Sequence, residues 1–199
     1  MILGLGVDLV FVPDFARQLE VPGTRFLEVF TGAERRAVER RVADRRVDSG
    51  GSAADHYAAR WAAKEAFIKA WSVAIAGQAP PIAPSDVVWQ EIEVYSDAWS
   101  RPLLRLHGAV AREVTRTLGP ISGSTGQKPG PADPKSGSTG QKSGPADPKG
   151  GSTGQKPGPA EPNSGPADQE SGSESEIRIH LSMSHDGDAA TATVIIEQV

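Results

Sequence analysis

The sequence contains no cysteine, and this absence narrows the chemistry that is open to the protein. Without thiols there is no disulfide framework, thiolate metal site or cysteine nucleophile. Aromatic residues make up only 6% of the 199 residues, and no hydrophobic run reaches the roughly 18 residues of a membrane span. The formal net charge of -4 is too close to neutral to indicate a nucleic-acid partner. We expect a cytoplasmic protein with no signal peptide, no membrane segment and no bound nucleic acid.

Large apolar residues are also scarce between residues 120 and 176, where a Gly/Pro/Ser-rich unit repeats. The three copies, with a period of about 14 residues, are Gly123–Ser136, Gly137–Gly150 and Gly151–Ser164. Such a segment buries too little apolar surface to offset the entropy lost on ordering. We therefore expect residues 120–176 to be a disordered, dispensable insert in a single domain formed by residues 1–119 and 177–199.

The segment RWAAKEAFIKAW, Arg60–Trp71, predicts a helix that is apolar on most sides and therefore lies in the interior. It nevertheless carries Glu65 and Lys69, which are four residues apart and share a face. A carboxylate on a buried helix is costly unless its charge is compensated. Either an ordinary structural ion pair with Lys69 or a bound metal ion could do this, and ion pairs on helices are the commoner case.

The N-terminal segment Ile2–Phe11 alternates with a period of two residues and predicts a strand. We expect its large residues, Leu3, Leu5, Val7, Leu9 and Phe11, to form the packed face. On the other face, Gly4 and Gly6 precede Asp8 and allow something to approach the backbone closely. A single acid on a strand is usually solvated, so Asp8 by itself is a weak signal.

The remaining patterns predict an α+β protein, in which helices pack on a small antiparallel sheet. The expected helices are Pro13–Glu20, one from the capping box Thr31–Glu34 to about Val47, one from the capping box Ser52–Asp55 to about Ala76, and Gly108–Leu118. The expected strands are Val87–Tyr95, Leu103–Leu106, Ile177–His185 and Ala189–Val199. The helix after Thr31 is dense in arginine, which fits either a solvated, salt-bridged face or a docking surface for an acidic partner.

Three segments taken together resemble the holo-[acyl-carrier-protein] synthase family of 4′-phosphopantetheinyl transferases. They are GLGVDLV (Gly4–Val10), RWAAKEAFIKAW (Arg60–Trp71) and HLSMSHDGDAATATVI (His180–Ile195). The stretch LEVFTGAER (Leu27–Arg35) and the turn WSRP resemble actinobacterial members. The similarity covers about residues 1–118 and 177–199. It implies the 4′-phosphopantetheinyl transferase fold and transfer of phosphopantetheine from coenzyme A to a serine of apo acyl carrier protein, with release of adenosine 3′,5′-bisphosphate.

The resemblance also implies a role for particular residues. Asp8 and Glu65 would be Mg²⁺ ligands, and Lys69 would stabilise phosphate charge. The base that deprotonates the carrier serine would be Glu65 or a metal-bound water, and the sequence leaves both open. The coenzyme A pocket would be lined by Arg60, Lys64, Pro102, Ser184 and His185.

Family members are typically homotrimers with the site between subunits, and a homotrimer is therefore expected. Many members have an arginine where this chain has Asp14, so the resemblance does not say how the carrier protein docks. Two other functions are compatible with the sequence. One is a non-catalytic nucleotide- or coenzyme-A-binding module that uses the insert as a scaffold, and the other is a purely structural α+β interaction domain.

Overall fold

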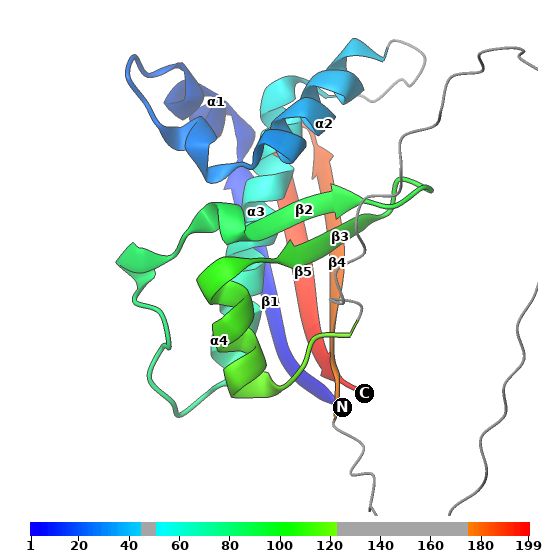
Figure 1. The fold of residues 1–199 in the computed structure, drawn as a ribbon. Coiled ribbons are helices and arrows are strands. Elements are labelled where there is room, and N and C mark those ends of the chain that lie inside the picture. The colour runs from blue at the N-terminus through cyan, green and yellow to red at the C-terminus, as the bar shows by residue number, and fades with distance from the viewer. Residues whose placement is uncertain (45–50, 123–174) are drawn as a thin grey trace, which may run out of the picture. The chain divides into compact units, whose positions relative to one another are not determined.

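The structure is a computed structural model that describes residues 1–44, 51–122 and 175–199. It confirms the α+β class, with four α-helices and two small antiparallel sheets among the described residues (Figure 1). The larger sheet has the strand order β1-β5-β4, with β1 at Ile2–Phe11, β4 at Ile177–Asp186 and β5 at Ala189–Gln198. The smaller sheet pairs β2 (Ile92–Ser96) with β3 (Pro102–Leu106). The chain thus brings its first and last strands together in one sheet.

The four helices are α1 (Val12–Glu20), α2 (Gly32–Ala43), α3 (Ala53–Ala74) and α4 (Gly108–Leu118). Both predicted capping boxes are present, with Thr31 and Glu34 at the start of α2 and Ser52 and Asp55 at the start of α3. In each box the N-cap hydroxyl accepts from the N3 amide, and the N3 carboxylate accepts from the N-cap amide. These local hydrogen bonds fix where the two helices begin.

Helix α3 is the central element and lies between the β1-β5-β4 sheet and a layer formed by α4 and the β2–β3 hairpin (Figure 1). Its small residues Ala62, Ala66 and Ala70 are fully buried and allow close approach of its neighbours. The main core also contains larger side chains from all three layers, among them Phe67, Trp71, Ile92, Val94, Val110, Val114, Val194 and Ile196. The prediction that this helix lies in the interior is confirmed.

Strand β1 forms as predicted, but the expectation about its two faces was wrong for the single chain. The glycine face is the covered one, because a Cβ on Gly4 or Gly6 would overlap the carbonyl oxygen of Ala70 or Ala66 of α3. The large side chains of the other face are exposed, by 50% at Leu5 and 70% at Leu9. Alternation shows which residues share a face, but it does not show which face a neighbour covers.

Other boundaries differ modestly from those expected. The predicted strand Val87–Tyr95 forms only from Ile92, because Pro84–Asp86 and Trp89–Glu91 are short 3-10 turns. Helix α2 ends at Ala43, and residues 45–47 of its expected end lie outside the described residues. Residues 123–174 of the expected insert also lie outside them. None of the helices in the described ranges has the length and apolar character to cross a membrane.

Candidate active site

An acidic cluster forms where β1 passes over α3. The glycines before Asp8 let the strand lie directly on the helix, so the Asp8 side chain is held against α3 and is only 7% exposed. Lys69 of α3 reaches it, with 2.7 Å between Lys69 Nζ and Asp8 Oδ1 and a second hydrogen bond of 3.2 Å to the Val7 carbonyl. The ion pair of Lys69 is therefore with Asp8. Two residues 61 positions apart in the sequence meet through backbone contact that only glycine permits.

Glu65 completes this cluster. It is partly buried on α3 and lies close to the Asp8 carboxylate. Burial, followed by the nearby Asp8 carboxylate, raises the pKa of Glu65 from 4.5 to about 7. The hydrogen bond to Asp8 raises the pKa of Lys69 as well. One ammonium group therefore faces two acids, and it cannot balance both carboxylates when both are ionised.

The donor set suits a hard divalent cation. Asp8 Oδ2 is buried and has no hydrogen-bond partner among the described residues. Nowhere in residues 1–44, 51–122 and 175–199 do three or more His, Cys, Asp or Glu side chains gather as a complete metal cage. Mg²⁺ commonly binds to one or two carboxylates and fills its other positions with waters and substrate phosphates. Asp8 and Glu65 are oxygen ligands that fit this pattern.

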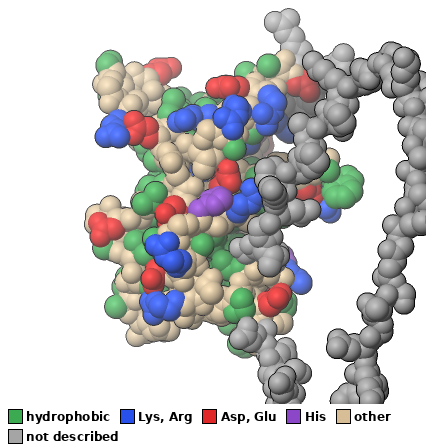
Figure 2. Space-filling model, in the orientation of Figure 1, with side chains coloured by type: hydrophobic (Ala, Val, Ile, Leu, Met, Phe, Trp, Pro, Cys, Tyr) green, Lys and Arg blue, Asp and Glu red, His purple; other side chains and the backbone are tan. Residues whose placement is uncertain are grey.

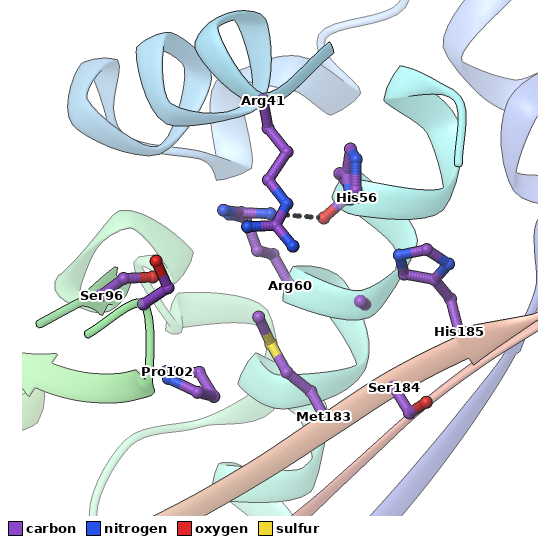
Figure 3. A pocket seen from close by; sticks show the side chains of 10 residues that line it. Arg41, His56, Arg60, Ser96, Pro102, Met183, Ser184 and His185 are labelled. Atoms are coloured by element: carbon purple, nitrogen blue, oxygen red, sulfur yellow. Dashed lines mark hydrogen bonds between the residues drawn. The ribbon is translucent and has the colours of Figure 1, made fainter. Parts of the chain in front are cut away.

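A pocket of about 280 Å³ opens at the end of β4 (Figure 3). Its walls come from four elements: α2, the N-terminal half of α3, the β2–β3 hairpin and β4. The lining residues are Arg41, His56, Ala59, Arg60, Ser96, Ser100, Pro102, Met183, Ser184 and His185. Arg41 extends from α2 toward Arg60 of α3, and His185 lies beside His56 (Figure 3).

Basic and imidazole side chains dominate this pocket. Burial lowers the pKa of Arg60, and burial together with nearby His185, Arg60 and Arg41 lowers the pKa of His56. Arg60 donates from Nη1 to the His56 carbonyl at 2.9 Å, but Arg60 Nε and His56 Nε2 are buried without a partner in the described part of the chain. Arginine guanidinium groups pair well with phosphate oxygens. The pocket is therefore built for an anion.

The structure brings most of the expected pocket residues together, but not Lys64. Arg60, Pro102, Ser184 and His185 all line the pocket. Lys64 is completely buried elsewhere, and its ammonium donates to Glu34 Oε2 (3.1 Å), to the Trp89 carbonyl (3.0 Å) and to the Ile92 carbonyl. The expectation that Lys64 contacts the ligand was therefore wrong, because its side chain extends from α3 into the core and not into the pocket.

Comparison with known proteins agrees with this architecture. The family model described as the 4′-phosphopantetheinyl transferase superfamily matches residues 4–118, more than half of the chain. The chain belongs to the 4′-phosphopantetheinyl transferase superfamily. The resemblance stated from the sequence motifs is confirmed, and the protein is an enzyme of this transferase superfamily.

Within this superfamily, the chain is similar to proteins named holo-[acyl-carrier-protein] synthase. A holo-[acyl-carrier-protein] synthase of Corynebacterium glutamicum is 48% identical over 122 residues, which is 61% of this chain and 85% of that protein. The holo-[acyl-carrier-protein] synthase of Mycobacterium tuberculosis H37Rv is 51% identical over 110 residues, or 55% of this chain and 77% of that one. A solved ACPS–CoA complex from Chronobacterium ammoniagenes is 34% identical with a TM-score of 0.64, covering 98% of this chain and 96% of that one.

Among the pocket residues of the transferase that were not singled out from the sequence, Arg41 and His56 carry the groups best suited to an anion. Arg41 was one of several arginines after Thr31, and nothing in the sequence separates it from its neighbours. His56 lies four residues before Arg60 and so shares its helix face, which is a signal that helical spacing could have revealed. Figure 2 shows that basic side chains gather on this face of the molecule, and of the arginines of α2 only Arg41 lines the described pocket.

Proposed function

We propose that this transferase is a Mg²⁺-dependent holo-[acyl-carrier-protein] synthase. It transfers 4′-phosphopantetheine from coenzyme A to a serine of apo acyl carrier protein and releases adenosine 3′,5′-bisphosphate. The names of its relatives and the coenzyme A complex of a 34% identical structure support this. The observation that carries the proposal is the Asp8–Glu65–Lys69 cluster, in which two acids share one ammonium group and one buried oxygen has no partner.

In the reaction the serine oxygen forms a bond to the pantetheine-bearing phosphorus, and the bond from that phosphorus to the bridging oxygen breaks. Mg²⁺, held by Asp8 and Glu65, supplies positive charge to the diphosphate when it is bound. Lys69 is 54% exposed at its side chain and lies at the edge of the cluster, where its ammonium reaches a phosphate oxygen. Glu65 is the base that this chain supplies for the serine proton.

The pocket takes the nucleotide end of coenzyme A. Arg41 and Arg60 bind phosphate oxygens, and His56 and His185 add imidazole N–H donors. Ser184 and Pro102 lie at its edge beside the nucleotide. In this arrangement the adenosine 3′,5′-bisphosphate portion is held by groups separate from the acidic cluster, so the leaving group stays bound while the transferred group reaches the serine.

The proposal includes a homotrimer with the active site between subunits. Asp8 lies on β1, the pocket lies at the end of β4, and β5 separates these two strands in the sheet. One ligand therefore contacts both sites most simply when β1 of one copy meets β4 of another. The exposed apolar face of β1 supports this assembly, with Leu5, Val7, Leu9 and Phe11 each about half or more exposed. A cytoplasmic location is part of the same proposal.

Mass spectrometry of apo acyl carrier protein tests the function directly. The carrier gains one phosphopantetheine when it is incubated with the protein, coenzyme A and Mg²⁺, and gains none in EDTA. Asp8→Ala and Glu65→Ala abolish the gain while the circular dichroism spectrum stays unchanged. A carrier that is never modified, or full activity in either variant, contradicts the proposed roles and favours a module that only binds coenzyme A.

A matched pair of arginine variants tests the pocket. Arg41 lines the pocket, whereas Arg36 lies exposed on the same helix outside it. Arg41→Ala should weaken the binding of adenosine 3′,5′-bisphosphate by about tenfold, the size of one charge-assisted hydrogen bond, and Arg36→Ala should change it less than about twofold. Isothermal titration calorimetry measures both, and equal losses would show that only overall charge matters.

A further inference from the structure

A fully buried ion pair joins Glu34 of α2 to Lys64 of α3 outside both sites described above. Both side chains are 0% exposed, with 3.1 Å between Lys64 Nζ and Glu34 Oε1. The remaining hydrogen-bonding capacity of the pair is also used. Glu34 accepts from the amides of Thr31 (2.7 Å) and Val94 (3.0 Å), and Lys64 donates to the carbonyls of Trp89 and Ile92. The pair is therefore a complete polar network in an apolar interior.

This network connects α2, which has few other buried side chains, to β2 and α3. Of the twelve residues of α2, only Glu34 and Val38 are buried, so half of the buried side chains of this helix belong to the ion pair. Within the described residues, the β2–β3 sheet shares no strand pairing with the larger sheet. Two hydrogen bonds join this sheet to α2: the Val94 amide donates to Glu34, and the Thr31 hydroxyl donates to Glu93 (3.0 Å). Glu34 and Lys64 thus fix α2 and β2 to the middle of α3.

The same elements carry the walls of the pocket. Arg41 lies at the far end of α2, two turns beyond Glu34. Ser96 and Pro102 lie at the end of the β2–β3 hairpin that Val94 anchors. In contrast, Arg60 and His56 lie on α3 itself, so the backbone that carries them is not part of α2. A rotation of α2 about its N-terminus would move Arg41 away from Arg60 and leave Arg60 in place.

We propose that Glu34 and Lys64 are positioning residues, and that their ion pair sets where α2 places Arg41 over the pocket. The proposal rests on the proposed function, in which this pocket binds the phosphates of coenzyme A. Directional hydrogen bonds suit this role better than apolar contacts, since an apolar helix face tolerates sliding and rotation whereas five polar contacts to three elements do not. Replacement of buried ion pairs by neutral residues is often tolerated thermodynamically, so the fold can survive their removal.

A double-mutant cycle with Arg41 tests the proposal. The background is Glu34→Gln with Lys64→Met, which removes both charges, keeps the side-chain volumes close and leaves an oxygen for the Val94 amide. In the wild type, Arg41→Ala weakens adenosine 3′,5′-bisphosphate binding about tenfold, and in the neutral background the same change costs less than about twofold. Arg60→Ala is the control and costs the same in both backgrounds. A purely structural role for the pair would leave the loss caused by Arg41→Ala unchanged, which overturns the proposal.

Hydrogen exchange separates this proposal from the proposed function. In the neutral background the amides of α2 and of β2–β3 should exchange at least about tenfold faster, while those of α4 are unchanged. If the α2 amides exchange equally fast in the wild type and in the neutral background, the positioning role is overturned, whether or not the wild type binds the nucleotide. If the wild type does not bind the nucleotide, that result refutes only the proposed function. If the double variant does not fold, Glu34→Gln by itself, which keeps an acceptor for Lys64, is measured in the same two assays with the same expectations.

Discussion

Replacing Glu65 by Gln should stabilise the metal-free protein while it destroys activity. In the wild type, burial and Asp8 raise the pKa of Glu65 from 4.5 to about 7, so the folded state disfavours the ionised form. At about 1.36 kcal/mol per pKa unit, this corresponds to an upper bound of about 3.4 kcal/mol at pH values above 7. Because Glu65 is only partly buried and Lys69 lies near it, solvent and counter-charge reduce the expected gain in unfolding free energy to about 1–2 kcal/mol.

The gain should depend on pH in one direction only. A carboxyl whose folded pKa exceeds its unfolded pKa binds its proton more tightly in the folded state, so stability falls as pH rises through that window. The wild type therefore loses stability between pH 4.5 and about 7, the range set by the pKa of Glu65. Gln does not titrate. The difference between variant and wild type should be absent near pH 4.5, grow to about pH 7 and then stay constant.

Urea unfolding in EDTA, followed by tryptophan fluorescence at three pH values across this range, measures the difference. Glu28→Gln serves as the matched control, because Glu28 is an exposed carboxylate paired with Arg25 and its removal should not stabilise the protein. Added Mg²⁺ should stabilise the wild type and leave the Glu65 variant unchanged. A variant that is less stable than wild type at pH 8, or a gain of the same size at every pH, would refute the reasoning.

Four further changes test separate parts of the structure. Gly6→Val should destabilise the protein by about 3 kcal/mol or more, since any Cβ there overlaps α3; urea unfolding within about 1 kcal/mol of wild type would contradict the packing. Trp71→Phe should cost about 1–2 kcal/mol in the same assay through loss of its 3.1 Å hydrogen bond to Thr117, and a neutral effect would show that bond to be unimportant. Val7→Lys should leave each monomer folded but should lower the mass of the assembly measured by sedimentation, because the oligomer dissociates. An unchanged assembly mass would exclude the β1 face as an interface. The pKa of His56 is lowered in the folded state, so the unfolded state binds more protons below about pH 6.5. Wild-type stability should therefore fall as the pH drops below about 6.5, by at most about 1.4 kcal/mol per pH unit. His56→Gln should flatten this slope, and an unchanged slope would show that His56 is not its source.

Local sequence rules predicted most of the secondary structure for identifiable reasons. The capping boxes at Thr31 and Ser52 close hydrogen bonds within four residues, so they need no tertiary partner to be recognised. Helix α4 begins and ends where its amphipathic pattern does. The strand predicted from Val87 failed in its first half, because the residues before Ile92 form turns that no local pattern distinguishes from an extended segment.

The candidate site was predictable where motif and geometry coincide. The acids Asp8 and Glu65 were named from their motifs, and the structure brings them together through the two glycines of β1. The roles of these residues stay predictions until metal binding and transfer are measured. Lys64 was misplaced because it stands next to Glu65 in the same motif, although one residue along a helix is a rotation of about 100°. That rotation turns Lys64 into the core and Glu65 toward β1.

By itself the sequence determined the elements, the family and the chemical groups of the site, because capping, periodicity and motif spacing are local properties of the chain. Only the tertiary structure decided which face of β1 is covered, which α2 arginine enters the pocket, and that Lys64 pairs with Glu34. Each of these depends on how a helix or strand is rotated against a neighbour that is distant in sequence. A period fixes which side chains share a face, and packing alone chooses what that face meets.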